Sequence, residues 1–250
     1  MSGGDFDVLI PARYASSRFP GKLLARLAGR PVLQHVHANA LASGARRVFV
    51  ATDDWRIRDA AIGFGAEVVM TDRDHRSGTD RIAEVVAAPG WPADRLVVNV
   101  QGDAPLLPPA DIAQVARLLA RHPEAAMATL CVALSDPAGY ADPNVVKLVM
   151  DQGGRALYFS RSPIPAIGHG ASPGDLRAWR HLGIYAYRAA ALLELTQAAP
   201  CYLEELERLE QLRALWLGME IRVGIAEEPP GPDVDTPEDL AAAERVLAAG

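Results

Sequence analysis

Cysteine is scarce in this chain of 250 residues. The two cysteines, Cys131 and Cys201, lie far apart in the sequence and in no C-x-x-C spacing. Two isolated cysteines cannot form the disulfide framework of a small secreted domain, and they lack the spacing of a zinc site. We therefore interpret both as small hydrophobic residues of the core.

Long apolar segments are also absent. No run approaches the ~18 consecutive apolar residues of a membrane-spanning helix. The first five residues lack the basic and apolar regions of a signal peptide. The sequence therefore predicts a soluble, cytoplasmic protein with no membrane partner.

Basic residues do not dominate the composition. The chain has 25 Lys and Arg residues against 31 Asp and Glu residues, which gives a net charge of -6. General nucleic-acid binders are more often basic, and an anionic membrane surface would repel this chain. We expect no nucleic-acid partner, and any anion must be bound by a local cluster of cations.

Several common functional motifs are missing. The sequence contains no G-x-G-x-x-G, no G-x-S-x-G, no H-E-x-x-H and no G-x-x-x-x-G-K-[S/T] pattern. Dinucleotide binding by a glycine fingerprint, serine-hydrolase chemistry, zinc-protease chemistry and a P-loop therefore lack support.

The first half of the chain does show a regular alternation of strand and helix patterns. Short apolar or β-branched runs alternate with amphipathic segments up to about residue 135. This alternation indicates an α/β fold with a mostly parallel sheet and helices on both faces. The predicted strands are 7–10, 46–54, 66–70, 94–103 and 125–134, and the predicted helices are 31–44, 55–65, 78–88 and 108–122.

The pattern changes in the second half. Residues 145–160 predict a β-hairpin, 181–187 and 219–226 predict strands, and leucines at every third position predict one helix over 202–218. A last helix is expected over 235–249 with Thr236 as its N-cap, and the Gly- and Pro-rich segment 168–174 predicts a surface loop. We expect one domain over 1–250 with a hairpin-containing insertion at about 136–190, the alternative being a separate C-terminal domain.

The loop after the first strand carries three cations. In an open parallel sheet, ligands bind beyond the carboxyl ends of the strands, which is where this loop is expected to lie. Arg13, Arg18 and Lys22 could neutralise a polyphosphate, and Gly21 would allow backbone N–H groups to come close. The spacing alone also fits a solvated basic loop.

Two aspartates are candidate ligands of Mg²⁺. Asp103 follows a run of residues typical of a buried strand, and Asp235 stands just outside the last predicted helix. Mg²⁺ in proteins is often bound by one or two carboxylates together with substrate phosphates. A turn aspartate before Pro105 is the alternative for Asp103, and sequence spacing does not show that the two carboxylates meet.

Other polar residues have both a functional and a structural interpretation. His181 could contact a substrate or be a hydrogen-bonded strand histidine, and Arg161 could bind a carboxylate or end a strand. Glu210 and Gln211 are adjacent in a predicted helix, so their side chains should point about 100° apart. Most residues of this kind lie on the surface.

Nine motifs occur in one order across roughly residues 7–248. They are IPARYASSRFPGK, ATDD, SGTDRIAE, VNVQGDAP, PNVVKLV, ALYFSRSPIP, HLGIYAYR, LEQLRALWLG and GPDVDTPEDL. Together they resemble the 3-deoxy-manno-octulosonate (Kdo) cytidylyltransferase family, also called CMP-Kdo synthetases. The resemblance implies a Rossmann-like fold of the nucleotide-diphospho-sugar transferase type, with a smaller part for sugar binding and dimerisation.

The same resemblance implies a function and a set of site residues. The reaction would be CTP + Kdo giving CMP-Kdo and pyrophosphate, with Mg²⁺ as cofactor, in a homodimer that serves lipopolysaccharide biosynthesis. Arg13, Lys22, Asp103 and Asp235 would be catalytic, and the two aspartates would hold the metal. The implied nucleotide-binding residues are Arg13, Arg18, Lys22, Ser77, Gly78, Thr79 and Arg81. The implied sugar-binding residues are Gln101, Arg161, His181, Tyr185, Glu210 and Gln211.

The chain departs from the family pattern in three places. Ala104 stands where the motif commonly reads Q-G-D-E-P, Asp80 replaces a glutamate, and A-I-G-H-G follows S-P-I-P in place of an aromatic residue and charges. The third difference falls near the expected sugar side. Another sugar acid, such as 8-amino-Kdo or sialic acid, therefore stays open. The rival classes are a non-catalytic nucleotide-binding protein on the same fold and a sugar-nucleotide glycosyltransferase.

Overall fold

The computed structural model describes residues 5–16, 18–170 and 177–249. Eleven strands and ten helical segments are assigned in this part of the chain. The strands are β1 Phe6–Ala12, β2 Arg26–Leu27, β3 Arg30–Pro31, β4 Arg47–Thr52, β5 Glu67–Met70, β6 Leu96–Asn99, β7 Met127–Leu134, β8 Lys147–Met150, β9 Ala156–Ser160, β10 Ala178–Arg188 and β11 Ile221–Ile225. The helices are the 3₁₀ turn Lys22–Leu24, α1 Val32–Ala42, α2 Trp55–Gly63, α3 Gly78–Ala87, α4 Pro109–Arg121, α5 Pro137–Ala141, α6 Ala189–Gln197, α7 Tyr202–Glu207, α8 Gln211–Trp216 and α9 Pro237–Ala249.

The main sheet has the strand order β11-β7-β10-β6-β1-β4-β5. Strands β6, β1, β4 and β5 run parallel to one another, and β11 runs parallel to β7. The long strand β10 is antiparallel to both of its neighbours, β6 and β7. The predicted α/β class with a mostly parallel sheet is therefore confirmed, with β10 as an antiparallel strand at its centre.

Strand β1 shows why this sheet is covered on both faces. Val8 and Ile10 belong to the hydrophobic cluster that includes α1 and α4, whereas Leu9, between them, packs in the cluster that includes α3 and α6. Alternate side chains of a strand point to opposite faces, so an uninterrupted apolar run needs a layer of helices on each side.

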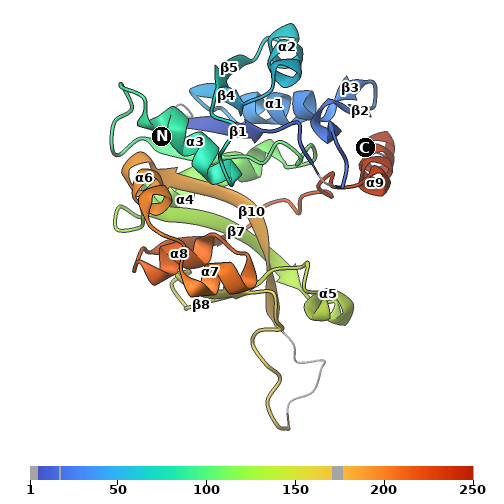
Figure 1. The fold of residues 1–250 in the computed structure, drawn as a ribbon. Coiled ribbons are helices and arrows are strands. Elements are labelled where there is room, and N and C mark those ends of the chain that lie inside the picture. Colours follow the sequence, from blue (N-terminus) through green and yellow to red (C-terminus); the bar gives the residue numbers. More distant parts are fainter. Residues whose placement is uncertain (1–4, 17, 171–176, 250) are drawn as a thin grey trace.

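The smaller part of the molecule is attached through β10. The N-terminal end of β10 pairs with β8, and β8 pairs with β9, which gives the predicted hairpin. Figure 1 shows β8, α5, α7 and α8 gathered at one end of the molecule, with β10 running from there into the main sheet. β10 lies inside the 136–190 range and is nevertheless part of the main sheet.

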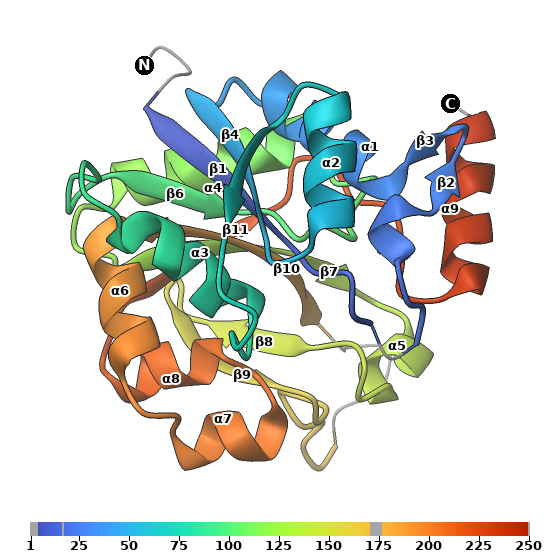
Figure 2. The same cartoon turned by 45° about the horizontal axis from the view of Figure 1, so that its top comes forward.

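The C-terminal helix packs against the arm formed by β2 and β3. Leu27, Val32, Val234 and Ala243 form a separate buried cluster there, and Figure 2 shows α9 beside this arm. Thr236 caps α9 as predicted: its hydroxyl accepts a hydrogen bond from the Asp239 N–H at 3.2 Å, and the Asp239 carboxylate accepts one from the Thr236 N–H at 2.9 Å.

The prediction of one continuous helix over 202–218 was wrong. Residues 202–218 form two short helices, α7 and α8, because Arg208 adopts a left-handed conformation with φ 54° and ends the first of them. The sequence patterns also gave no indication of α5, α6 or the β2–β3 arm. Residues 171–174 of the predicted loop 168–174 lie outside the described residues.

Both cysteines are free and buried, which confirms their interpretation as core residues. Burial raises the pKa of Cys131 to about 12, so its thiol is protonated at neutral pH. None of the helices in the described part of the chain combines the length and apolar character needed to cross a bilayer.

Candidate functional site

A cleft of about 750 Å³ lies where the carboxyl ends of β1 and β6 meet the segment before α9. The loop after β1, the start of α3 and the turn after β6 supply its walls. The predicted site residues that line it are Arg13, Arg18, Lys22, Ser77, Gly78, Arg81, Gln101, Asp103 and Asp235. The structure thus brings most of the predicted nucleotide and metal residues to one edge of the sheet.

Two glycines allow the loops of this cleft to approach each other. Gly21 has φ 71°, and a Cβ there would stand 3.1 Å from the Tyr14 ring. A Cβ on Gly102 would stand 2.9 Å from the backbone oxygen of Pro11. A larger residue at Gly102 would push the turn that carries Asp103 away from the end of β1, and one at Gly21 would crowd Tyr14 within the cationic loop.

Lys22 joins the two candidate metal ligands. Its Nζ lies 2.5 Å from Asp103 Oδ2 and 2.8 Å from Asp235 Oδ1, and Arg18 Nη2 lies 2.9 Å from Asp235 Oδ2. Partial burial alone would lower the pKa of Lys22, but the two carboxylates outweigh this and raise it overall. Partial burial would likewise raise the pKa of Asp235, but Lys22 and Arg18 hold it below its ordinary value.

A backbone hydrogen bond brings the distant aspartates together. The Val234 N–H donates to the Asp103 carbonyl oxygen at 2.8 Å, and the Val234 side chain is buried under the β2–β3 arm. The segment before α9 is therefore fastened to the turn after β6. The carboxylates of Asp103 and Asp235 consequently converge on one point, where the ammonium of Lys22 sits.

The start of α3 forms another wall of the cleft. Ser77 is the N-cap of α3, and its hydroxyl accepts the Asp80 N–H at 3.1 Å. The Arg81 guanidinium is nearly buried and donates to Thr71 Oγ1 and to the Asp72 carbonyl oxygen. Arg81 therefore enters the cleft from a fixed position.

Thr79 does not line this cleft. It is buried and lies close to Tyr187 and Glu210. Burial raises the pKa of Glu210, although hydrogen bonds from Thr79 and Ser77 oppose the shift. Thr79 thus lies between the two predicted residue sets, in contact with the sugar set.

Gln101 connects the main cleft to a second, smaller cavity of about 110 Å³. His181 lines that cavity, and its ring packs between the rings of Phe159 and Tyr185 at centroid distances of 5.2 Å. His181 Nε2 lies 2.9 Å from Thr129 Oγ1. Burial lowers the pKa of His181 to about 3, so the imidazole is neutral at physiological pH.

Tyr185 is the next predicted sugar residue along β10. Its hydroxyl is buried and has no hydrogen-bond partner among the described residues. Burial raises the pKa of Tyr185 well above its ordinary value, so the hydroxyl keeps its proton and remains a donor for a ligand.

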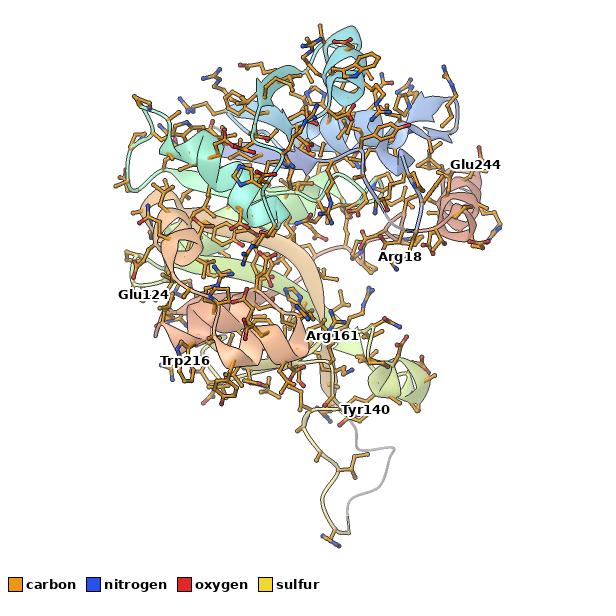
Figure 3. The ribbon with its side chains drawn as sticks, viewed as in Figure 1. Arg18, Glu124, Tyr140, Arg161, Trp216 and Glu244 are labelled. Carbon is orange, nitrogen blue, oxygen red and sulfur yellow. The ribbon has the colours of Figure 1, made fainter. Side chains whose placement is uncertain are left out.

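The remaining predicted sugar residues lie on the smaller part. Arg161 follows β9, and Glu210 and Gln211 stand at the start of α8 with Gln211 buried. Figure 3 shows Arg18 and Arg161 projecting from the two different parts of the molecule. These three residues and Tyr185 do not line either cavity described above, so the sugar set is not gathered into one cavity.

The sequence analysis missed several residues that line these cavities, among them Arg180 in the small one. Tyr14 and His75 line the main cleft, and Asp233 lines the small cavity. His75 Nε2 lies 2.5 Å from Glu84 Oε2. His75 and Asp233 are each two residues from a predicted site residue, Ser77 and Asp235, and that proximity is a signal that could have identified them.

The chain matches known cytidylyltransferases along most of its length. A family model described as "Cytidylyltransferase" matches residues 8–221. A 3-deoxy-manno-octulosonate cytidylyltransferase of Pseudomonas syringae pv. tomato is 53% identical, with 98% of each chain covered. One from Thioalkalivibrio sulfidiphilus is 52% identical, with 98% of this chain and 99% of the relative covered.

Solved structures give the same result. A CMP:2-keto-3-deoxy-manno-octonic acid synthetase complexed with CTP matches with a TM-score of 0.90 and 40% identity, over 98% of this chain and 99% of the other. A 4-diphosphocytidyl-2C-methyl-D-erythritol synthase from Anaerococcus prevotii matches with a TM-score of 0.61 at 13% identity, which supports the fold alone.

Proposed function

The chain belongs to the 3-deoxy-manno-octulosonate cytidylyltransferase family, and on that premise we propose that it catalyses CTP + Kdo giving CMP-Kdo and pyrophosphate. The observation that carries this function is identity of 52–53% over nearly the full length of its curated relatives. The cations and carboxylates gathered in one cleft supply the chemistry that the reaction needs. Its product would serve lipopolysaccharide biosynthesis.

The main cleft is the proposed CTP site. Arg13, Arg18 and Lys22 would bind the triphosphate, since guanidinium and ammonium groups pair with phosphate oxygens. Ser77, Gly78 and Arg81 would lie beside the cytosine. When CTP binds, Lys22 would exchange its carboxylate partners for phosphate oxygens, which frees Asp103 and Asp235.

Asp103 and Asp235 fit a magnesium site. Their oxygens already converge on one cation, the Lys22 ammonium. The residues that the structure describes contain no cluster of three or more His, Cys, Asp or Glu side chains suited to a metal. Substrate phosphates would therefore complete the coordination, as is common for Mg²⁺. Bound there, Mg²⁺ would neutralise phosphate charge and lower the pKa of the attacking hydroxyl.

The proposed sugar site lies on the other side of Gln101. Gln101, His181 and Tyr185 would bind hydroxyl groups of Kdo, with His181 acting as a neutral hydrogen-bonding group. Arg161 would pair with the sugar carboxylate, and Glu210 and Gln211 would complete the site from α8.

These positions predict how the reaction proceeds. The anomeric hydroxyl of Kdo attacks the α-phosphorus and loses its proton to solvent, the bond between that phosphorus and the bridging oxygen breaks, and pyrophosphate leaves. Arg13 and Lys22 would stabilise the charge that builds on the phosphoryl oxygens. The remaining residues hold the two substrates in line, which removes much of the entropic cost of the reaction.

We further propose a cytoplasmic homodimer. The smaller part exposes a group of apolar side chains, Tyr202, Leu206 and Trp216, which are 61%, 78% and 58% exposed. Exposed apolar groups of this size often mark an interface. The free, buried cysteines suit a reducing compartment, and a reaction that consumes CTP suits the cytoplasm.

The test is pyrophosphate release with CTP, Mg²⁺ and Kdo, with the sugar nucleotide identified by its mass. Parallel reactions contain 8-amino-Kdo or sialic acid in place of Kdo. Release with Kdo is the expected result. Release with only another acid would keep the cytidylyltransferase chemistry and change the sugar. No release from folded protein that still binds CTP would favour the non-catalytic alternative.

A further inference from the structure

Lys147, in the P-N-V-V-K-L-V motif, has a role that the reaction does not yet account for. It is the first residue of β8, its side chain is 0% exposed, and it forms no ion pair with any described carboxylate. A buried ammonium is costly unless all its hydrogen-bond donors are satisfied. A lysine at this position therefore needs a specific set of partners.

Three backbone carbonyl oxygens supply those partners. Lys147 Nζ donates to Asp142 O at 2.9 Å, to Val145 O at 2.7 Å and to Arg161 O at 2.5 Å. Two of these belong to the loop before β8, and the third belongs to the turn after β9. The β8–β9 pairing ends at Lys147 and Ser160, and the ammonium continues the connection beyond it, between the loop before β8 and Arg161.

The loop before β8 and the end of α7 hold the Arg161 side chain. Arg161 Nε donates to the Glu207 carbonyl oxygen at 2.7 Å, and Arg161 Nη1 donates to the Pro143 carbonyl oxygen at 3.0 Å. The Arg161 N–H also donates to Glu207 Oε2 at 2.7 Å. Within the described residues Arg161 Nη2 makes no hydrogen bond, so one edge of the guanidinium is left for an anion.

We propose that Lys147 is a positioning residue for the sugar-acid substrate, because it fixes both the backbone of Arg161 and the loop that aims the Arg161 guanidinium. This inference rests on the proposed function, in which Arg161 binds the Kdo carboxylate. Lys147 itself is sealed from the substrate and acts only through Arg161.

The test is the Lys147→Met variant, which keeps an unbranched side chain only one atom shorter and removes its three donors. We expect the KM for Kdo to rise about tenfold or more, with the KM for CTP within about twofold of wild type. The matched control is Arg155→Met, an exposed arginine of the same hairpin, which should leave both KM values unchanged.

A double-mutant cycle separates positioning from a purely structural role. If Lys147 acts through Arg161, Arg161→Ala alone raises the KM for Kdo, and adding Lys147→Met to it causes little further loss. Additive effects of the two substitutions, equal changes in both KM values, or an unchanged KM for Kdo in Arg161→Ala would each overturn the proposal.

Two further controls cover the remaining outcomes. If Lys147→Met does not fold, Lys147→Gln, which keeps two donors, is measured in its place. Failure of both to fold while Arg155→Met folds would show that Lys147 serves the fold and would overturn the proposal. Pyrophosphate release by the wild type with Kdo tests the proposed function separately, so its failure is distinguished from a failure of the Lys147 proposal.

Discussion

A single ammonium group, on Lys22, holds two carboxylates that are far apart in the sequence. Asp103 and Asp235 both contact it, and Arg18 contacts Asp235 as well. Because the pKa of Asp235 is held below its ordinary value, this ion pair contributes stability at neutral pH, and the contribution is lost as the pH falls through the lowered pKa. The free protein thus keeps Asp235 charged and holds the two proposed metal ligands together before any substrate arrives.

Replacing Asp103 by Asn tests the metal role at the residue scale. The side chain is partly exposed and supports no core packing. We expect kcat for pyrophosphate release to fall about 100-fold or more, with little change in the melting temperature. Asp94→Asn, an exposed aspartate just before β6, is the control. A kcat near that of wild type in Asp103→Asn would remove Asp103 from the catalytic residues.

His181 predicts a specific pH dependence of stability. Its pKa is about 3 in the folded chain and near 6.5 when unfolded, so between these values only the unfolded chain takes up a proton at this site. The wild type should therefore lose stability as the pH falls from 7 to 5. In His181→Gln we expect this loss to be smaller by about 1–2 kcal/mol.

Urea unfolding at pH 7 and pH 5 measures the effect, with wild type and His181→Gln compared at both values. An equal loss of stability in the two proteins would show that His181 is not buried as a neutral imidazole.

At the scale of elements, the break between α7 and α8 decides where the proposed sugar residues lie. Leucines at every third position predicted one continuous helix, but Leu206 is exposed whereas Leu209 and Leu212 are buried. The left-handed turn at Arg208 lies between Leu206 and Leu209 and reorients the chain there. The turn also sets Glu210 beside Thr79 and buries Gln211.

Arg208→Gly tests the cost of this turn. Arg208 is exposed and has φ 54°, a conformation that costs an L-residue about 1–2 kcal/mol and glycine almost nothing. After the extra chain entropy of glycine is subtracted, we expect the free energy of unfolding to rise by about 0.5 kcal/mol. Arg208→Ala also removes the long side chain but keeps the backbone strain, so its free energy of unfolding should not increase. A loss of stability in Arg208→Gly would contradict this explanation.

At the scale of the whole molecule, the site spans two parts that share β10. The nucleotide residues lie at the carboxyl edge of the parallel strands, whereas Arg161, Glu210 and Gln211 belong to the smaller part. The rest of that part carries the exposed group of Tyr202, Leu206 and Trp216, with the rings of Tyr202 and Trp216 in edge-to-face contact at 5.4 Å.

The proposed homodimer is tested by placing charge on this apolar group. The Leu206→Glu/Trp216→Glu double variant should be a monomer, because two carboxylates in an apolar interface are strongly unfavourable. Sedimentation equilibrium gives the mass. Trp55→Glu, an equally exposed tryptophan on α2, is the control and should leave the dimer intact. A monomeric wild type, or a variant that stays dimeric, would contradict the proposed interface.

The sequence by itself determined the class of fold and the location of the cationic loop. Strand and helix periodicities are local, so the α/β alternation and the N-cap at Thr236 could be read without knowing any long-range contact. The ordered motifs, from the loop with Arg13 to the segment with Asp235, indicated the family for the same reason, since each motif is a short local pattern.

Only the tertiary structure decided which distant residues meet. The convergence of Asp103 and Asp235 depends on the hydrogen bond from Val234 to the Asp103 backbone. The division of 202–218 into α7 and α8 depends on which of its leucines are buried against the rest of the molecule. The burial of Lys147 depends on carbonyl oxygens from two separate loops. Spacing along the chain carries no information about such contacts, because they form between segments whose approach is set by the packing of the whole molecule.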